Sequence, residues 1–315
     1  MSTRGMTPFE IAGAALGLPD VTRAGWLTTS DFPSLLATTA DKVLRTAYAT
    51  VPRTFLPFSR QTTLPDFKPR TILQLGEAPQ LLKVPEHGEI KFGVIGEGKE
   101  TYQLATYARR IGMTRQMIVN DDLDGFGRMA QAFGVAAATL ENDLVWEQIT
   151  SNPAMGDGTA LFHADHGNLV SPGTAISIDN LGIAMGKIQL QKGLDATTRL
   201  NLQPKFLLAP VAKMTVARQY LTTITPALPT SVNPYAGALD VVVEPRLDAN
   251  SLTAWYVVAD PAQVDVIEYA YLDGQDGVRT ETRQGWEIEG VEIKAVLDFA
   301  AKIIDWRGIA KNLGA

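Results

Sequence analysis

The sequence predicts an α+β protein, and three regions of the chain support this fold class. Residues 121–150 carry the longest helical pattern, residues 51–118 are broken by prolines into short β-rich runs, and residues 264–297 alternate with the two-residue period of half-buried antiparallel strands. This order differs from the regular strand–helix alternation of a doubly wound fold. We therefore expect one long helix packed with antiparallel strands that come much later in the chain.

The helix predicted over residues 121–150 has one long apolar face. Its apolar members recur every three to five residues and are Leu123, Phe126, Ala130, Phe133, Ala137, Leu140, Leu144 and Ile149. Asp121 is a favourable N-cap type, and Pro153 ends the pattern. About 30 residues would span roughly 45 Å. Glycines inside the pattern oppose a helix by up to about 1 kcal/mol each, so packing must offset them. Alone, such a helix is typical of an ordinary enzyme core.

Residues 1–50 precede these regions and are predicted to form an N-terminal arm of short helices. Helix-start signals occur at Thr7-Pro8 and at Ser30-Asp31. Thin helical pieces cannot bury their own apolar sides, so the arm is expected to lie on another surface.

Residues 51–118 are predicted to form an extended hairpin. Prolines forbid a long helix here, and β-rich runs occur at 71–75, 80–84, 89–95, 101–108 and 115–119. Pro85-Glu86-His87-Gly88 separates two alternating runs and is expected at the hairpin tip. Isolated hairpins are marginal in water, so a long one implies a partner surface, such as another subunit.

The chain after the long helix is predicted to be mixed and then β-rich. Helices are expected over 179–194 and 211–224, a buried strand over 204–210, and a functional or mobile loop over 225–238. The further strands are expected at 239–245, 253–260, 264–272, 278–284 and 290–299. The last residues, 300–315, are expected to finish as a basic, flexible tail.

Composition excludes several classes of protein. The 315 residues include 28 basic and 34 acidic side chains, for a net charge of −6, which argues against a protein that works by neutralising phosphates. The chain has no cysteine, so disulfides and thiolate chemistry are excluded. No apolar run approaches the roughly 18 residues of a membrane span, and the N-terminus makes a poor signal peptide.

One cluster has residue types that could perform chemistry. His163, Asp165 and His166 could ligate zinc in a metallo-hydrolase or supply a base. Helix-borne metal pairs place histidines at i and i+4, whereas these are at i and i+3 in a Gly- and Asn-rich loop, so a hydrogen-bonded loop is the favoured interpretation. The sequence has no GxSxG elbow, no GxGxxG and no P-loop. We expect no enzyme, and no catalytic, cofactor-binding or metal residues.

Several long stretches in order resemble the major capsid proteins of tailed phages, in particular the major head subunits of Mu-like phages and the capsid part of prohead protease–capsid fusions. These stretches are Thr28-Thr29-Ser30-Asp31-Phe32-Pro33, ENDLVWEQITSNPAMGDGTALFHADHGNL (141–169), PKFLLAP (204–210) and DFAAKIIDWRGIAKN (298–312). The resemblance covers nearly the whole chain.

The resemblance implies the Hong Kong 97-type capsid fold. It implies an N-terminal arm at 1–50, an E-loop at 51–118, a P-domain at 119–150 and 263–297, and an A-domain at 151–262 and 298–315. The upstream protease and scaffolding segment of the fused relatives are not in this sequence, so a separate gene product or a trimmed form is expected. Some relatives crosslink an E-loop lysine to a neighbour's asparagine; no matching asparagine is evident here, and we predict no crosslink.

The implied function is structural. The chain would assemble with itself into hexamers and pentamers of an icosahedral shell around double-stranded DNA, with weak, non-specific DNA contact. A portal, scaffold and decoration proteins would be further partners, and no membrane is involved. The expected location is the virion capsid, with assembly in the host cytoplasm. The alternative is an encapsulin-like nanocompartment of the same fold.

Overall fold

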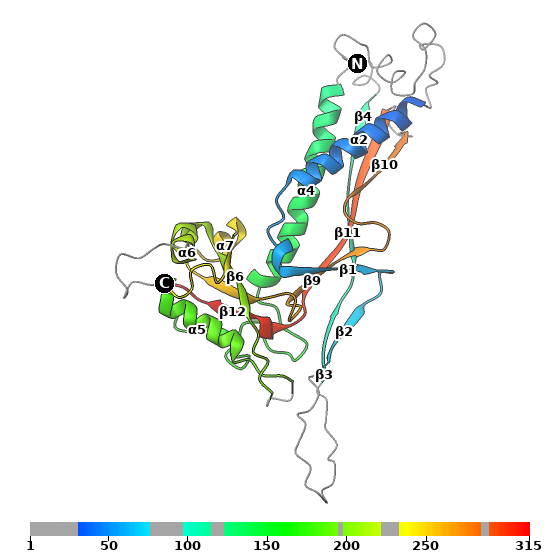
Figure 1. Cartoon of the computed structure of the whole chain (residues 1–315). Helices are drawn as coiled ribbons and strands as arrows, with labels where there is room; N and C mark the ends of the chain where they lie inside the picture. The colour runs from blue at the N-terminus through cyan, green and yellow to red at the C-terminus, as the bar shows by residue number, and fades with distance from the viewer. Residues whose placement is uncertain (1–30, 76–96, 115–122, 195–197, 222–232, 285–289) are drawn as a thin grey trace, which may run out of the picture. The chain divides into compact units, whose positions relative to one another are not determined.

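The computed structural model describes residues 31–75, 97–114, 123–194, 198–221, 233–284 and 290–315. The chain forms two compact units. Unit 1 contains Met1–Arg53, Ala105–Glu141 and Tyr271–Phe299, and unit 2 contains Thr54–Leu104, Asn142–Ala270 and Ala300–Ala315. Figure 1 shows the elements, three of which pass from one unit into the other along the chain: helix α4 (Leu123–Thr150), strand β9 (Ile267–Leu272) and strand β11 (Gly290–Ile303).

Unit 1 combines two helices with a sheet in which β11 is central. Strands β4 (Ala105–Thr114) and β10 (Arg279–Gln284) both pair antiparallel with β11. Ala295 and Leu297 of β11 lie beside Phe133 and Leu140 of α4, so the apolar face of the helix covers one face of this sheet. Helix α2 (Asp31–Thr50) packs against β10.

A glycine lets α2 approach α4 closely. A Cβ atom at Gly134 would lie 2.3 Å from the carbonyl oxygen of Leu44 and 2.9 Å from the backbone nitrogen of Tyr48. No side chain fits in that space, because real Cβ contacts are essentially never under 3.0 Å. Gly134 is therefore required by packing, even though glycine weakens a helix interior.

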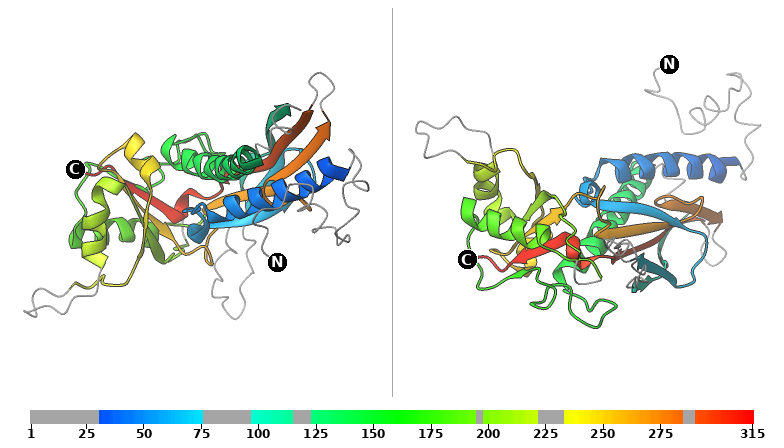
Figure 2. Two further views of the ribbon diagram at one scale, coloured as in Figure 1. Left: turned by 90° about the horizontal axis from the view of Figure 1, so that it is seen from above. Right: turned by 60° about the horizontal axis from the view of Figure 1, so that its bottom comes forward.

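Unit 2 is built on a five-stranded mixed sheet with the order β5-β12-β8-β6-β7. The strands are β5 (Leu169–Val170), β6 (Pro204–Ala209), β7 (Asp240–Val243), β8 (Trp255–Ala259) and β12 (Ile309–Asn312). Helices α5 (Ile178–Gln189) and α6 (Met214–Leu221) pack on this sheet, and α7 (Pro245–Asn250) follows β7 (Figure 2). Leu181, Leu207, Trp255 and Val257 are fully buried in its core. The bulk of β6 and β8 is buried on both faces, which explains their continuous apolar runs.

The remaining strands extend the β11 sheet or form a separate two-stranded ribbon. Strands β1 (Ser59–Leu64) and β9 (Ile267–Leu272) continue the β11 sheet in the order β1-β9-β11-β10. Strands β2 (Arg70–Leu75) and β3 (Glu97–Tyr102) pair only with each other, as an antiparallel ribbon in which Leu75 pairs with Glu97.

Most of the predicted elements are confirmed within the described residues. The long helix begins at Leu123 and ends at Thr150, the second helix start in the arm begins α2 at Asp31, and the late strands are antiparallel. The runs at 80–84, 89–95 and 115–119, the tip around His87 and most of the loop at 225–238 lie outside the described residues. Within the described parts of the chain, no helix has the length and apolar character that a membrane span needs.

Three expectations are wrong in detail. The helix predicted over 179–194 ends at Gln189, because Gln191 and Gly193 turn back to bond with the chain near Arg199. The run at 101–108 is divided between β3 and β4, which lie in different sheets. The tail is not flexible: Ile309 and Ala310 are buried in β12, which is held between β5 and β8.

Candidate functional site

The loop that carries His163, Asp165 and His166 was the best chemical candidate, and His166 is its buried member. Its Nδ1 lies 3.0 Å from the carbonyl oxygen of Leu161, and its Nε2 lies 2.8 Å from Oδ2 of Asp157. Its ring stacks on Trp306 with ring centres 4.2 Å apart. Burial opposes ionisation of Asp157, but the hydrogen bonds from His166 and from the backbone of Thr159, together with the charge of His166, outweigh burial and lower the pKa of that carboxyl. Both ring nitrogens of His166 are thus engaged within the protein.

The other two members of the cluster do not converge with His166 on a common point. His163 is exposed, and its Nδ1 accepts a hydrogen bond from the backbone N–H of Asp165 at 3.2 Å. Buried Asn168 donates to the carbonyl oxygens of Leu161 and Trp306 and accepts from the backbone of His163. No group of three histidine, cysteine or carboxylate side chains among the described residues is placed to hold a metal ion. The geometry is that of a hydrogen-bonded loop.

The same loop fastens the β2–β3 ribbon to the rest of unit 2. Buried Glu100 of β3 accepts a hydrogen bond from the backbone N–H of Gly156 at 2.5 Å, and the ammonium of Lys302 lies 3.6 Å from the same carboxylate. The backbone approaches closely here, because a Cβ atom at Gly156 would lie 1.9 Å from the carbonyl oxygen of Lys99. Any side chain at position 156 would therefore displace β3.

A second anchor holds the ribbon at the end where Arg70 of β2 pairs with Tyr102 of β3. The hydroxyl of Tyr102 donates to buried Glu268 of β9 at 2.5 Å, and the guanidinium of Arg70 lies 3.6 Å from the same carboxylate. Burial and the neighbouring carboxylate raise the pKa of Tyr102, so the phenol stays a donor. The outer side chains of the ribbon, including Leu73 and Thr101, are exposed.

Unit 1 contains a buried polar cluster centred on Glu141 of α4. Its Oε1 accepts hydrogen bonds from the hydroxyls of Tyr48 and Tyr271, the latter at 2.9 Å, and Arg53 lies 3.5 Å from Oε2. Burial raises the pKa of Glu141, although its hydrogen-bonding partners oppose this. Burial and the charge of Glu141 raise the pKa of both tyrosines. The cluster ties the arm helix, the long helix and the end of β9 together within unit 1.

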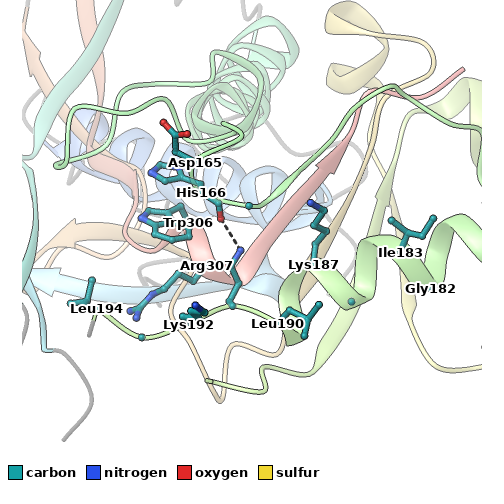
Figure 3. A pocket seen from close by; sticks show the side chains of 14 residues that line it. Asp165, His166, Gly182, Ile183, Lys187, Leu190, Lys192, Leu194, Trp306 and Arg307 are labelled. Atoms are coloured by element: carbon teal, nitrogen blue, oxygen red, sulfur yellow. Dashed lines mark hydrogen bonds between the residues drawn. The ribbon is translucent and has the colours of Figure 1, made fainter. Parts of the chain in front are cut away.

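A groove of about 750 Å³ lies in unit 2 beside the histidine loop (Figure 3). Helix α5 contributes Gly182, Ile183, Gly186 and Lys187, and further lining comes from Leu190 and Trp306. Its buried polar side chains are already bonded within the protein: Gln191 donates to the carbonyl oxygen of His166 and Arg307 pairs with Asp305. Among the described lining residues, these buried polar side chains are thus not free to converge on a small molecule.

Sequence reasoning missed the residues that hold these features. Glu100, Glu141 and Gly156 lie in patterns that look like an exposed strand, a helix face and a loop turn. Their roles depend on partners 40 or more residues away, for example 56 residues for the Glu100–Gly156 bond and 93 for the Tyr48–Glu141 bond. The only local signal was the glycine-rich composition of the loop.

The chain belongs to the phage capsid protein family, whose model matches residues 98–312. It is thus a phage capsid protein, and its place is the capsid of the virion. No curated protein matches the sequence.

Solved structures with the same fold come from phages and from an encapsulin complex. The capsid chain of Mycobacterium phage Patience is 13% identical with a TM-score of 0.52, covering 90% of this chain and 89% of that chain. The procapsid chain of bacteriophage JBD30 is 16% identical with a TM-score of 0.50, covering 92% and 77%. An encapsulin from Synechococcus elongatus PCC 7942 is 9% identical with a TM-score of 0.50, covering 83% and 86%. At these identities the likeness shows the fold alone, which is the Hong Kong 97-type capsid fold.

Proposed function

We propose that this chain is the major capsid subunit and assembles with itself into hexamers and pentamers that close an icosahedral shell around double-stranded DNA. The observation that carries the proposal is the β2–β3 ribbon, in a chain of the phage capsid family. The ribbon pairs with no other strand among the described residues and leaves side chains such as Leu73 exposed, yet it is firmly anchored at its base. A two-stranded ribbon is marginal alone, so a neighbouring subunit is the natural surface to stabilise it.

The parts of the chain take roles in this proposal. Residues 1–50 act as the N-terminal arm and 51–118 as the E-loop, with the β2–β3 ribbon as its described base. Residues 119–150 and 263–297 form the P-domain, and 151–262 with 298–315 form the A-domain. Assembly takes place in the host cytoplasm with a portal, a scaffold and decoration proteins as partners, and without enzymatic activity of the chain. The net charge of −6 suits a container that holds its DNA weakly.

Electron microscopy of the purified protein tests the proposal. We expect rings, sheets or closed shells in negative stain and a large species in light scattering. A stable monomer or dimer at micromolar concentration would contradict shell formation. The encapsulin likeness motivates a second measurement, because the fold is shared: nuclease-protected DNA inside the particles supports a phage head, whereas a protein cargo without DNA supports a nanocompartment.

Shortening the ribbon tests the role of the E-loop. Because Leu75 pairs with Glu97, residues 76–96 can be replaced by Asn-Gly, which closes a two-residue hairpin turn. The shortened chain should keep the circular dichroism and melting temperature of its parent but fail to close shells. Normal shells from this variant would contradict the assignment of residues 51–118.

A further inference from the structure

The exposed large apolar side chains of unit 2 that follow residue 104 gather at two places. Among the described residues, one group lines the groove and the other lies near the end of β12. The groove holds Ile183 and Leu190, which are 51% and 62% exposed, and the second group consists of Val211, Leu252 and Leu313, at 43%, 60% and 41%. We name the second group the apolar edge. Exposed apolar groups of this kind mark contact surfaces when they cluster.

The groove is shaped to accept side chains rather than a polar ligand. Gly186 lines the groove, and a Cβ atom added at this residue would meet no heavy atom within 4 Å. Ile183, Leu190 and the stacked ring of Trp306 supply apolar surface, and Lys187 and Asp165 supply charges of both signs at its rim (Figure 3).

The apolar edge is held together by contacts around the last strand. The hydroxyl of Thr253 donates to the carbonyl oxygen of Leu313 at 3.3 Å. Leu252 directly precedes Thr253 in the sequence, so this bond brings Leu252 near Leu313. The backbone N–H of Val211 donates to Asp248 of α7 at 2.6 Å. The ammonium of Lys213 donates to the carbonyl oxygen of Ala315 at 3.0 Å, so this edge also carries both an acid and a base.

The groove and the apolar edge lie at opposite ends of the same strands. Strand β12 runs antiparallel to β8 and parallel to β5. The groove residue Trp306 precedes β12 and His166 precedes β5, whereas Leu313 follows β12 and Leu252 precedes β8. One copy of unit 2 therefore cannot bring its own groove and edge together.

We propose that the groove receives the apolar edge of a second copy of this chain in a head-to-tail contact. The inference rests on the proposed shell function, because it names which surfaces of neighbouring subunits meet. The charges are reciprocal: Lys187 of the groove can face Asp248 of the edge, and Asp165 can face Lys213. Two different surfaces on one subunit generate a heterologous contact, which closes into a ring when the rotation per subunit permits it. A ring is the geometry that hexamers and pentamers require.

The absence of cysteine from the sequence makes a direct test possible. Leu190→Cys labels the groove and Leu252→Cys labels the edge, and purified particles are treated with a short bis-maleimide. The variant carrying both cysteines should give a ladder of dimers, trimers and larger species on a denaturing gel. Co-assembly of the two single variants should give dimers and nothing larger. A control with Leu190→Cys and Gln219→Cys, an exposed position on α6, should remain monomeric.

Each outcome decides the inference. A ladder from the double variant, with dimers only from the co-assembled single variants, supports the head-to-tail contact. Particles of the double variant that stay uncrosslinked overturn it, and so do dimers from Leu190→Cys alone, since these would show groove facing groove. If the double variant does not form particles, the pair Ile183→Cys and Leu313→Cys replaces it under the same criteria. Failure of the parent chain to assemble would instead count against the proposed function.

Discussion

Gly134 provides a stringent test of how the arm helix packs on the long helix in unit 1. The perturbation is Gly134→Ala, which adds a single methyl group. Helix propensity alone predicts a gain, because alanine is favoured over glycine inside a helix by about 1 kcal/mol. The structure predicts the opposite sign.

The magnitude follows from the distance between the helices. The new methyl group would lie 2.3 Å from the carbonyl oxygen of Leu44, whereas ordinary contact begins at 3.4 Å, so α2 must retreat by the difference of 1.1 Å. Overpacking costs about 1–3 kcal/mol. The retreat also moves Tyr48 away from buried Glu141, and losing a hydrogen bond to such a group costs about 1.5–3 kcal/mol. After the propensity gain, we expect a net loss of about 1.5–5 kcal/mol.

The assay is urea denaturation of the unassembled protein, followed by far-ultraviolet circular dichroism. Gly186→Ala is the matched control, since it is also a glycine inside a helix but has no heavy atom within 4 Å of the added Cβ. That control should raise the free energy of unfolding by up to about 1 kcal/mol. If Gly134→Ala proves as stable as its parent or more stable, the close packing of α2 on α4 is refuted.

Three further predictions concern the other anchors. Gly156→Leu should leave the subunit folded but push Lys99 of the ribbon away from residue 156, so that limited proteolysis of the ribbon accelerates and shells fail to close; unchanged proteolysis would refute this. Glu141→Gln should become more stable relative to its parent as pH rises above 4.5, because the raised pKa of Glu141 gives the parent a stability contribution that is complete at low pH and is lost as the carboxyl ionises. Urea denaturation at several pH values measures the difference in unfolding free energy, and a difference that does not change with pH would contradict the buried environment. His166→Ala should lower the free energy of unfolding by about 2–3 kcal/mol through loss of its hydrogen bonds and its stacking on Trp306. Added zinc should leave the melting temperature of the parent unchanged, and a rise in melting temperature with zinc would restore the metal interpretation.

The sequence was informative wherever a pattern is periodic and local. The apolar residues of the long helix and the buried run of β6 identify their elements without any tertiary information. The helix-start signal at Asp31 and the alternation in β10 and β11 likewise identify their elements. These signals depend on neighbours within one or two turns or along one strand, so they survive in any fold that the chain adopts.

What could not be predicted depends on contacts between distant parts of the chain. The tail is predicted to be basic and flexible, yet pairing with β5 and β8 makes its residues 309–312 an internal strand of the sheet. Gly134 looked like a weakness of the helix, but its value lies in a contact with Leu44 that is 90 positions away in the sequence. Helix α5 likewise ends early because Gln191 turns to bond with Leu200. Local propensity carries no information about such partners.

The buried charged groups explain why a catalytic-looking motif has a structural role here. A site that acts on a ligand must leave polar atoms free to bind it, but both ring nitrogens of His166 are hydrogen-bonded, to Leu161 and to Asp157. Glu100 and Glu141 are used in the same way, each joining segments that are far apart in the sequence. A capsid subunit has to keep its shape while its outer surfaces remain free for other copies. This requirement predicts buried polar groups that are bonded within the protein, and exposed apolar groups that can contact other copies. Unit 2 has both, with its exposed apolar groups at two opposite ends.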